Sequence, residues 1–148
     1  MKRIVLLENN GVPPDSSWEL IDEIIDPDED EAKEIYFAID RTNEVMATLE
    51  TYSRLTRRGD ELILVLNSAF ANREQVEKLS NFLLDLPVVL TLYVWDLESF
   101  LEDINRDFYT FYSSDTVEVI NRLIDKSICY DVNNTTKGLK IKEYGKNI

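Results

Sequence analysis

The chain has 148 residues, of which 29 are Asp or Glu and 16 are Lys or Arg, and it contains no histidine. A formal charge of −13 repels nucleic acid and acidic membranes and attracts basic surfaces. Without histidine, no Ser-His-Asp or Cys-His arrangement can form, and no side chain has an ordinary pKa suited to proton transfer near neutral pH. The composition therefore favours a non-enzymatic binding protein over an enzyme.

Size and hydrophobicity predict one folded unit. Apolar residues make up 44% of the chain, which is enough for a core at this length, so we expect a single domain over residues 1–148. Cys129 is the only cysteine, which excludes an intrachain disulfide and a cysteine-based zinc cluster, and we expect a buried, unreactive thiol. The apolar run 4–7 is too short for a signal peptide or a membrane span. We expect a soluble, cytoplasmic protein that needs no cofactor.

The first half of the chain alternates between strand and helix patterns. The apolar, β-branched run 4–7 predicts a buried strand that ends in the turn cluster 8–11. Ser16 and Glu19 have the spacing of a capping box before an apolar helical pattern, which Pro27 ends. Further elements are expected as a strand over 35–39, a helix over 45–55 and an aliphatic strand over 62–66.

The second half continues the alternation and ends differently. Asn72 and Gln75 begin a predicted helix that runs to residue 86, and the apolar run 88–95 is the strongest strand pattern in the chain. Asp96 precedes a strongly amphipathic helix over 97–112, and Asp115 begins another. Residues 128–132 and 139–144 alternate around the polar segment 133–138, which predicts a hairpin.

Strands that alternate with helices require right-handed crossovers, which place the strands in a parallel sheet. The strand patterns are continuous rather than alternating in hydrophobicity, as expected for strands covered on both faces. The predicted fold is therefore an α/β single domain with a mostly parallel central sheet, helices on both faces and a C-terminal β-hairpin.

Acidic residues are concentrated in two segments. Residues 15–34 hold ten acids and one base, and residues 96–118 hold seven acids and one base. Like charges four residues apart on a helix each cost about 0.2–0.5 kcal/mol. Three such pairs are Glu98 with Glu102, Asp103 with Asp107, and Asp22 with Asp26. These residues are either ordinary solvated helix faces or a surface shaped for a cationic partner.

The second interpretation predicts a basic protein partner. One candidate is a basic toxin that a cytoplasmic immunity protein neutralises, and another is a nucleic-acid enzyme with a basic cleft, since acidic side chains can occupy the place of phosphates. No direct contact with nucleic acid or membrane is expected. An aromatic anchor would add affinity, and Tyr109 is the best candidate because it lies off the apolar stripe of its helix. The other aromatic candidates, for which core packing is the simpler expectation, are Trp18, Trp95, Phe108 and Tyr112. The sequence indicates neither which partner binds nor an oligomeric state.

An enzymatic alternative rests on the strand ends. Ligands of open α/β sheets bind at the carboxyl ends of the strands, where Glu8, Asp40 and Asp96 are expected. Oxygen ligands from several strand ends can hold Mg²⁺, as in phosphoryl-transfer enzymes and nucleases. Asp40 and Asp96 also each precede a predicted helix, where capping explains an aspartate without a metal.

Two short segments resemble response-regulator receiver domains. The segment 3–10 is similar to their first strand, which ends in paired acids, and the segment 64–70 is similar to their fourth strand with its hydroxyl residue. The resemblance implies a phosphoryl switch. The chain departs from that pattern because Asn9 stands in place of the second acid, Trp95 and Asp96 stand in place of Lys-Pro, and four βα units are predicted instead of five.

Overall fold

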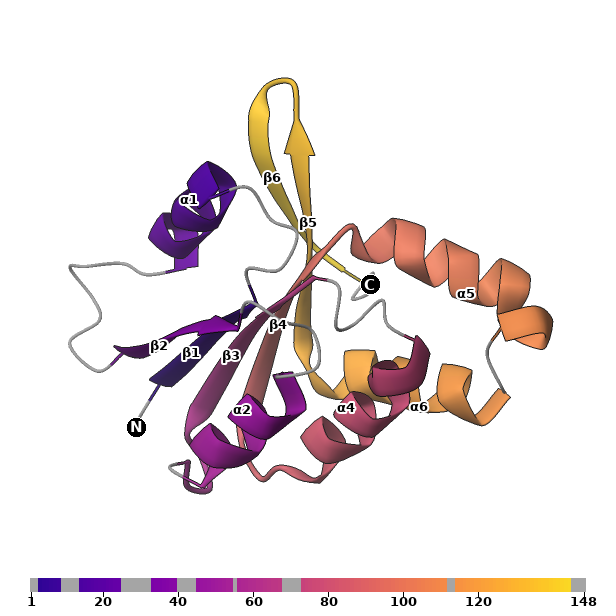
Figure 1. Ribbon diagram of the computed structural model, residues 1–148, viewed down its shortest axis with the longest axis horizontal. Helices are drawn as coiled ribbons and strands as arrows, with labels where there is room; N and C mark the ends of the chain where they lie inside the picture. The colour runs from indigo at the N-terminus through magenta and orange to yellow at the C-terminus, as the bar shows by residue number, and fades with distance from the viewer. Residues whose placement is uncertain are drawn as a thin grey trace.

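The computed structural model describes residues 3–8, 14–24, 33–39, 45–54, 56–67, 73–111 and 114–144 (Figure 1). Strands and helices alternate along the chain up to a final pair of strands. The elements in chain order are β1 (Arg3–Glu8), α1 (Pro14–Ile24), β2 (Lys33–Ile39), α2 (Val45–Ser53), β3 (Glu61–Leu66), α4 (Arg73–Asp85), β4 (Val89–Trp95), α5 (Leu97–Phe111), α6 (Ser114–Lys126), β5 (Ile128–Thr135) and β6 (Gly138–Glu143).

The strands form one six-stranded sheet in the order β2-β1-β3-β4-β5-β6. The pairs β1–β2, β1–β3, β3–β4 and β4–β5 are parallel, and β5–β6 is antiparallel. The first five strands therefore have the order of flavodoxin-like doubly wound sheets, in which the chain reverses direction between β1 and β3. This arrangement confirms the predicted α/β fold with its mostly parallel sheet and terminal hairpin.

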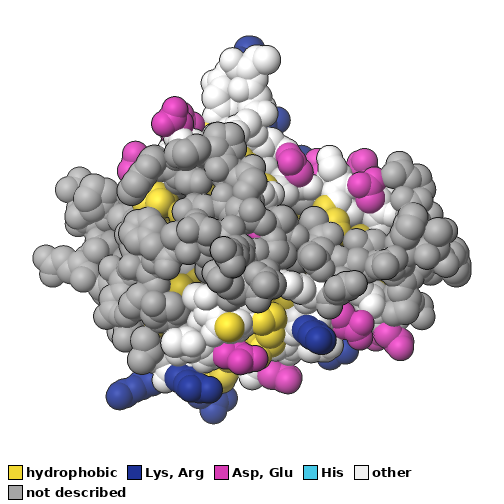
Figure 2. Space-filling model, viewed as in Figure 1, with side chains coloured by type: hydrophobic (Ala, Val, Ile, Leu, Met, Phe, Trp, Pro, Cys, Tyr) yellow, Lys and Arg dark blue, Asp and Glu magenta, His cyan; other side chains and the backbone are white. Residues whose placement is uncertain are grey.

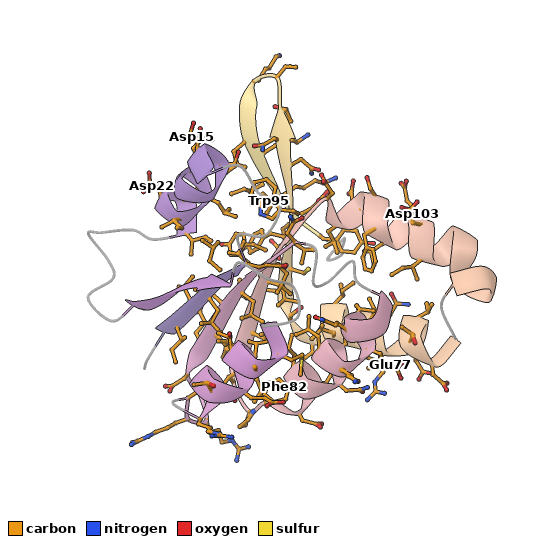
Figure 3. All side chains as sticks on the ribbon, viewed as in Figure 1. Asp15, Asp22, Glu77, Phe82, Trp95 and Asp103 are labelled. Atoms are coloured by element: carbon orange, nitrogen blue, oxygen red, sulfur yellow. The ribbon has the colours of Figure 1, made fainter. Side chains whose placement is uncertain are left out.

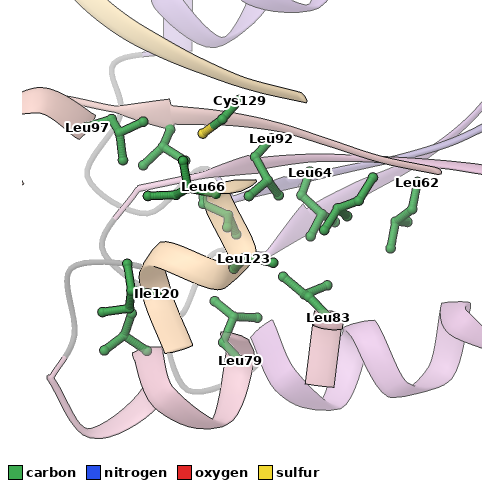
Figure 4. Packing of buried hydrophobic residues seen from close by; sticks show 14 of the residues in the cluster. Leu62, Leu64, Leu66, Leu79, Leu83, Leu92, Leu97, Ile120, Leu123 and Cys129 are labelled. Carbon is green, nitrogen blue, oxygen red and sulfur yellow. The ribbon is translucent and has the colours of Figure 1, made fainter. Parts of the chain in front are cut away.

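The two faces of the sheet carry separate cores, because successive side chains of a strand point to opposite faces. On one face, aliphatic side chains of β1, β3 and β4 pack against α2, α4, α5 and α6 (Figure 4). On the other face the core includes α1, which contributes Leu20, Ile21 and Ile24, together with Trp95 and Val132. Helices thus lie on both faces, as predicted, with most of the described helices on one of them.

Two helices begin earlier than the sequence predicts. The capping-box pattern predicts that Ser16 precedes the first helix, but α1 begins at Pro14 and contains Ser16 in its first turn. Proline suits that position, because its fixed φ is helical and its missing N–H would have had no partner in the first turn. Similarly, α6 begins at Ser114, one residue before the predicted start at Asp115.

The hairpin is longer than predicted. Strands β5 and β6 pair up to Thr135 and Gly138, so that most of the predicted loop 133–138 belongs to the ladder and the turn is short. Gly138 has φ +108°, a conformation that other residues rarely adopt, and this allows the chain to reverse there. The hairpin projects beyond the other strands at the top of Figure 1.

The end of α4 is bonded to α6. The Lys126 ammonium donates hydrogen bonds to the carbonyls of Leu83, Leu84 and Leu86 at 3.1, 2.8 and 2.8 Å. A cation at this end of a helix satisfies carbonyls that lack intrahelical partners and interacts favourably with the helix dipole. This contact fixes the two helices side by side over the sheet. None of the described helices is long and apolar enough to cross a membrane.

Candidate partner-binding surface

The amphipathic pattern of α5 separates an apolar face from an acidic one. Leu97, Leu101 and Ile104 are buried against the sheet, with exposed fractions of 6% or less. On the outer side, Glu98, Glu102 and Asp103 are all exposed. Figure 3 shows Asp103 directed away from the sheet.

The start of α5 is held by a carboxylate from a neighbouring strand. Asp131 of β5 is 4% exposed, and its Oδ1 accepts a hydrogen bond from the Leu97 N–H at 2.9 Å. Asp96 is the residue that was expected to cap this helix, and it has a φ of +54°. Its backbone N–H donates a hydrogen bond to the Val132 carbonyl at 2.9 Å. The acidic face of α5 is therefore fixed by Asp131, a residue that no sequence pattern indicated.

A second acidic face lies on α1. Its apolar residues are buried against the sheet, while four acids on the opposite side are exposed. Within the described residues, none of these four acids forms an ion pair. The four exposed acids of α1 are Asp15, Glu19, Asp22 and Glu23.

The hairpin β5–β6 separates the two acidic helices and contacts both. On the α1 side, Asn134 donates a hydrogen bond to the Ser16 hydroxyl at 2.9 Å. On the α5 side, the Lys142 ammonium lies 3.5 Å from a Glu98 carboxylate oxygen. Both partners of this ion pair are exposed, so it contributes little to stability. Acidic side chains accordingly appear on both sides of the hairpin in Figure 2.

We compared the chain with protein-family models, with curated proteins and with solved structures. No match was found in any of the three comparisons.

Several predicted binding residues fall outside the described part of the chain. Asp26 and Tyr112 lie outside the described residues. Asp107, Phe108 and Tyr109 belong to α5, and Trp18 belongs to α1, but their side chains are not among those described. Of the aromatic alternatives, Trp95 is 9% exposed and belongs to the core between the sheet and α1, in agreement with the expectation of core packing.

The predicted metal ligands are not brought together in the described part. Glu8 is fully buried at the end of β1, and its Oε1 accepts a hydrogen bond from the Asn67 N–H at 2.6 Å. Asp96 is exposed at the end of β4, and Asp40 lies outside the described residues. Among the residues that are described, no group of three acidic, cysteine or histidine side chains is placed to hold a metal ion.

One aromatic pair was not predicted from the sequence. Tyr93 of β4 and Tyr130 of β5 are directly paired in the parallel register, and their rings stack with centroids 4.7 Å apart and planes inclined by 14°. Burial raises the pKa of Tyr93 to about 12, with smaller contributions from Tyr130, Glu61 and Glu23. Burial, followed by Glu143 and Glu61, also raises the pKa of Tyr130. The pair thus lies in a negative environment.

The single cysteine agrees with its prediction. Cys129 is 1% exposed and belongs to the larger core cluster. Burial, and to a smaller extent the negative charge of Asp131, raises the pKa of its thiol to about 12. Because the thiolate is the reactive form, this side chain is inert at neutral pH.

A third acidic area lies between α4 and α6. A shallow depression of about 220 Å³ is lined by side chains of mixed character from the two helices. Glu77 accepts a hydrogen bond from the Thr116 hydroxyl at 3.0 Å. The lining residues are Glu77, Asn81, Asp115, Glu118, Val119 and Arg122. The arginine makes this area less negative than the outer faces of α1 and α5.

Proposed function

We propose that this chain is a non-enzymatic acidic binding protein whose partner is a basic protein. The observation that carries the proposal is the placement of exposed acids on α1 and α5, on the two sides of one hairpin. A surface of this sign accelerates encounter with a basic partner and disfavours nucleic acid. The role that fits best is that of an inhibitor or immunity-type protein, which neutralises a basic effector such as a toxin nuclease or another nucleic-acid enzyme.

The energetics of the surface support binding rather than stability. Glu98 and Glu102 are exposed like charges four residues apart, and their mutual repulsion costs about 0.2–0.5 kcal/mol. The buried Asp131 carboxylate nevertheless holds the first turn of that helix in place. A fixed backbone reduces the ordering cost of association, which favours a preformed binding face.

The test is kinetic. The tagged chain is used to capture its partner from the source cell, and association is then measured from low to high salt. The variant Glu98→Lys/Glu102→Lys should slow association at least tenfold at low salt and change dissociation less, because exposed charges act mainly on encounter. Raising the salt concentration should reduce the difference.

The matched control is Asp85→Lys/Asp125→Lys, which changes the net charge equally on exposed positions of α4 and α6. The control should slow association by about threefold or less, since it alters only the overall field. The proposal fails if the chain retains no basic protein, if association is independent of salt, or if the two double variants behave alike.

A further inference from the structure

The sheet face that carries α1 has an apolar area near the amino ends of β4 and β5. Val89 and Ile128 are the exposed large hydrophobic residues of the described part, at 47% and 37% exposure. Both share this face with the tyrosine pair, because residues two apart along a strand point to the same side. In the strand register Ile128 is paired with Thr91, and it lies two residues before Tyr130 on β5.

Carboxylates surround this area on three sides. Glu143 of β6 is paired directly with Tyr130 across the hairpin, and Glu61 of β3 is paired with Val89. From the α1 side, Glu23 is close enough to act on the ionisation of Tyr93. The ring faces and the negative charge therefore come from five different elements of the fold.

We propose that the Tyr93–Tyr130 pair is the anchoring site for an arginine side chain of the basic partner. This inference rests on the proposed function and names the surface on which its specificity depends. A guanidinium is planar, stacks on aromatic faces and is more weakly hydrated than an ammonium, so it suits an aromatic pair beside carboxylates better than lysine does. The apolar stem of the side chain would lie on Val89 and Ile128.

The experiment uses nona-arginine and nona-lysine as probes, with binding measured by calorimetry at low salt. Wild-type protein should bind nona-arginine about twofold to fivefold more tightly than nona-lysine, the range expected for a cation–π contact at an exposed site. Tyr130→Leu should remove this preference, because it keeps apolar volume and loses the ring. Tyr130→Phe should keep it.

Two controls separate this inference from the proposed function. Tyr144→Leu changes a half-buried tyrosine packed against the other core cluster and should leave the arginine preference unchanged. Glu98→Lys/Glu102→Lys should weaken binding of both peptides equally. If that double variant weakens binding while Tyr130→Leu retains the preference, the arginine site is refuted and the acidic binder stands.

Three other outcomes overturn the inference. Equal affinity of wild-type protein for the two peptides refutes arginine recognition, and the absence of binding to either peptide refutes the proposed function as well. A dimer in sedimentation equilibrium that Val89→Lys dissociates would assign this face to a second copy of the chain.

Discussion

Replacement of Asp131 by alanine tests how the acidic face of α5 is held. The Oδ1 of this buried carboxylate accepts the Leu97 N–H at 2.9 Å, at the positive end of the helix. A hydrogen bond to a charged group contributes about 1.5–3 kcal/mol, and a charge at a helix terminus adds up to about 2 kcal/mol in partly buried sites. Removal of the buried charge recovers part of its desolvation cost, so we expect a net loss of about 2 kcal/mol.

The measurement is urea unfolding followed by circular dichroism, together with thermal unfolding. A loss of about 2 kcal/mol corresponds to about 4–8 °C in Tm for a chain of this size. Asp131→Asn retains a carbonyl acceptor and loses only the charge, so it should cost about 1 kcal/mol. Asp125→Ala, an exposed position on α6, is the control and should change stability by less than about 0.5 kcal/mol.

Hydrogen exchange localises the effect. In Asp131→Ala the Leu97 amide should exchange faster than in wild-type protein, because its acceptor has been removed. The reasoning is refuted if the alanine and asparagine variants are equally stable, or if both match wild-type protein.

Two further predictions concern stability. Lys126→Met should lower the free energy of unfolding by about 1–2 kcal/mol in urea titrations, because the end of α4 loses its three charge-assisted hydrogen bonds. The control Lys78→Met, at an exposed position of α4, should lower it by less than about 0.5 kcal/mol. Equal losses in the two variants would refute the capping role of Lys126. The Cys129 thiol has a pKa of about 12 in the folded protein against an ordinary value of 9.0, so the unfolded chain releases its proton first and stability falls as pH rises from 9.0 towards 12. The free energy of unfolding changes with this group by up to about 1.4 kcal/mol per pH unit. Between about pH 8 and pH 10.5, wild-type protein should therefore lose about 2 kcal/mol of stability relative to Cys129→Ala. Parallel pH profiles of the two proteins would contradict the assignment.

Local pattern was sufficient for the elements and for the fold class. The aliphatic run Leu62–Leu66 was predicted as a strand, and in the structure it belongs to β3, where all five side chains are buried between β1 and β4. The predicted start of α1 was wrong, since the capping-box pattern predicts that Ser16 precedes the helix, whereas α1 begins at Pro14.

The parts of the site that the sequence could not predict depend on pairing across long separations. Asp131 caps α5 from a strand 34 residues away in sequence, and only the β4–β5 register brings it there. The same register stacks Tyr93 on Tyr130, although each tyrosine has the pattern of an ordinary strand residue. The position of the exposed charges, by contrast, could be predicted directly, because the helical period places Glu98 and Glu102 on the side of α5 opposite its apolar residues.

For the proposed basic partner, the hairpin between α1 and α5 would make the acidic surface bivalent. Each helix alone offers exposed charges, and a contact between such charges and a basic side chain contributes about 1 kcal/mol or less. A partner that spans the hairpin and touches both helices makes its second contact within one complex, at a high effective concentration. Release then requires both contacts to open together, so the span of the partner across the hairpin sets its residence time. A basic protein too narrow to reach both helices would bind fast and leave fast.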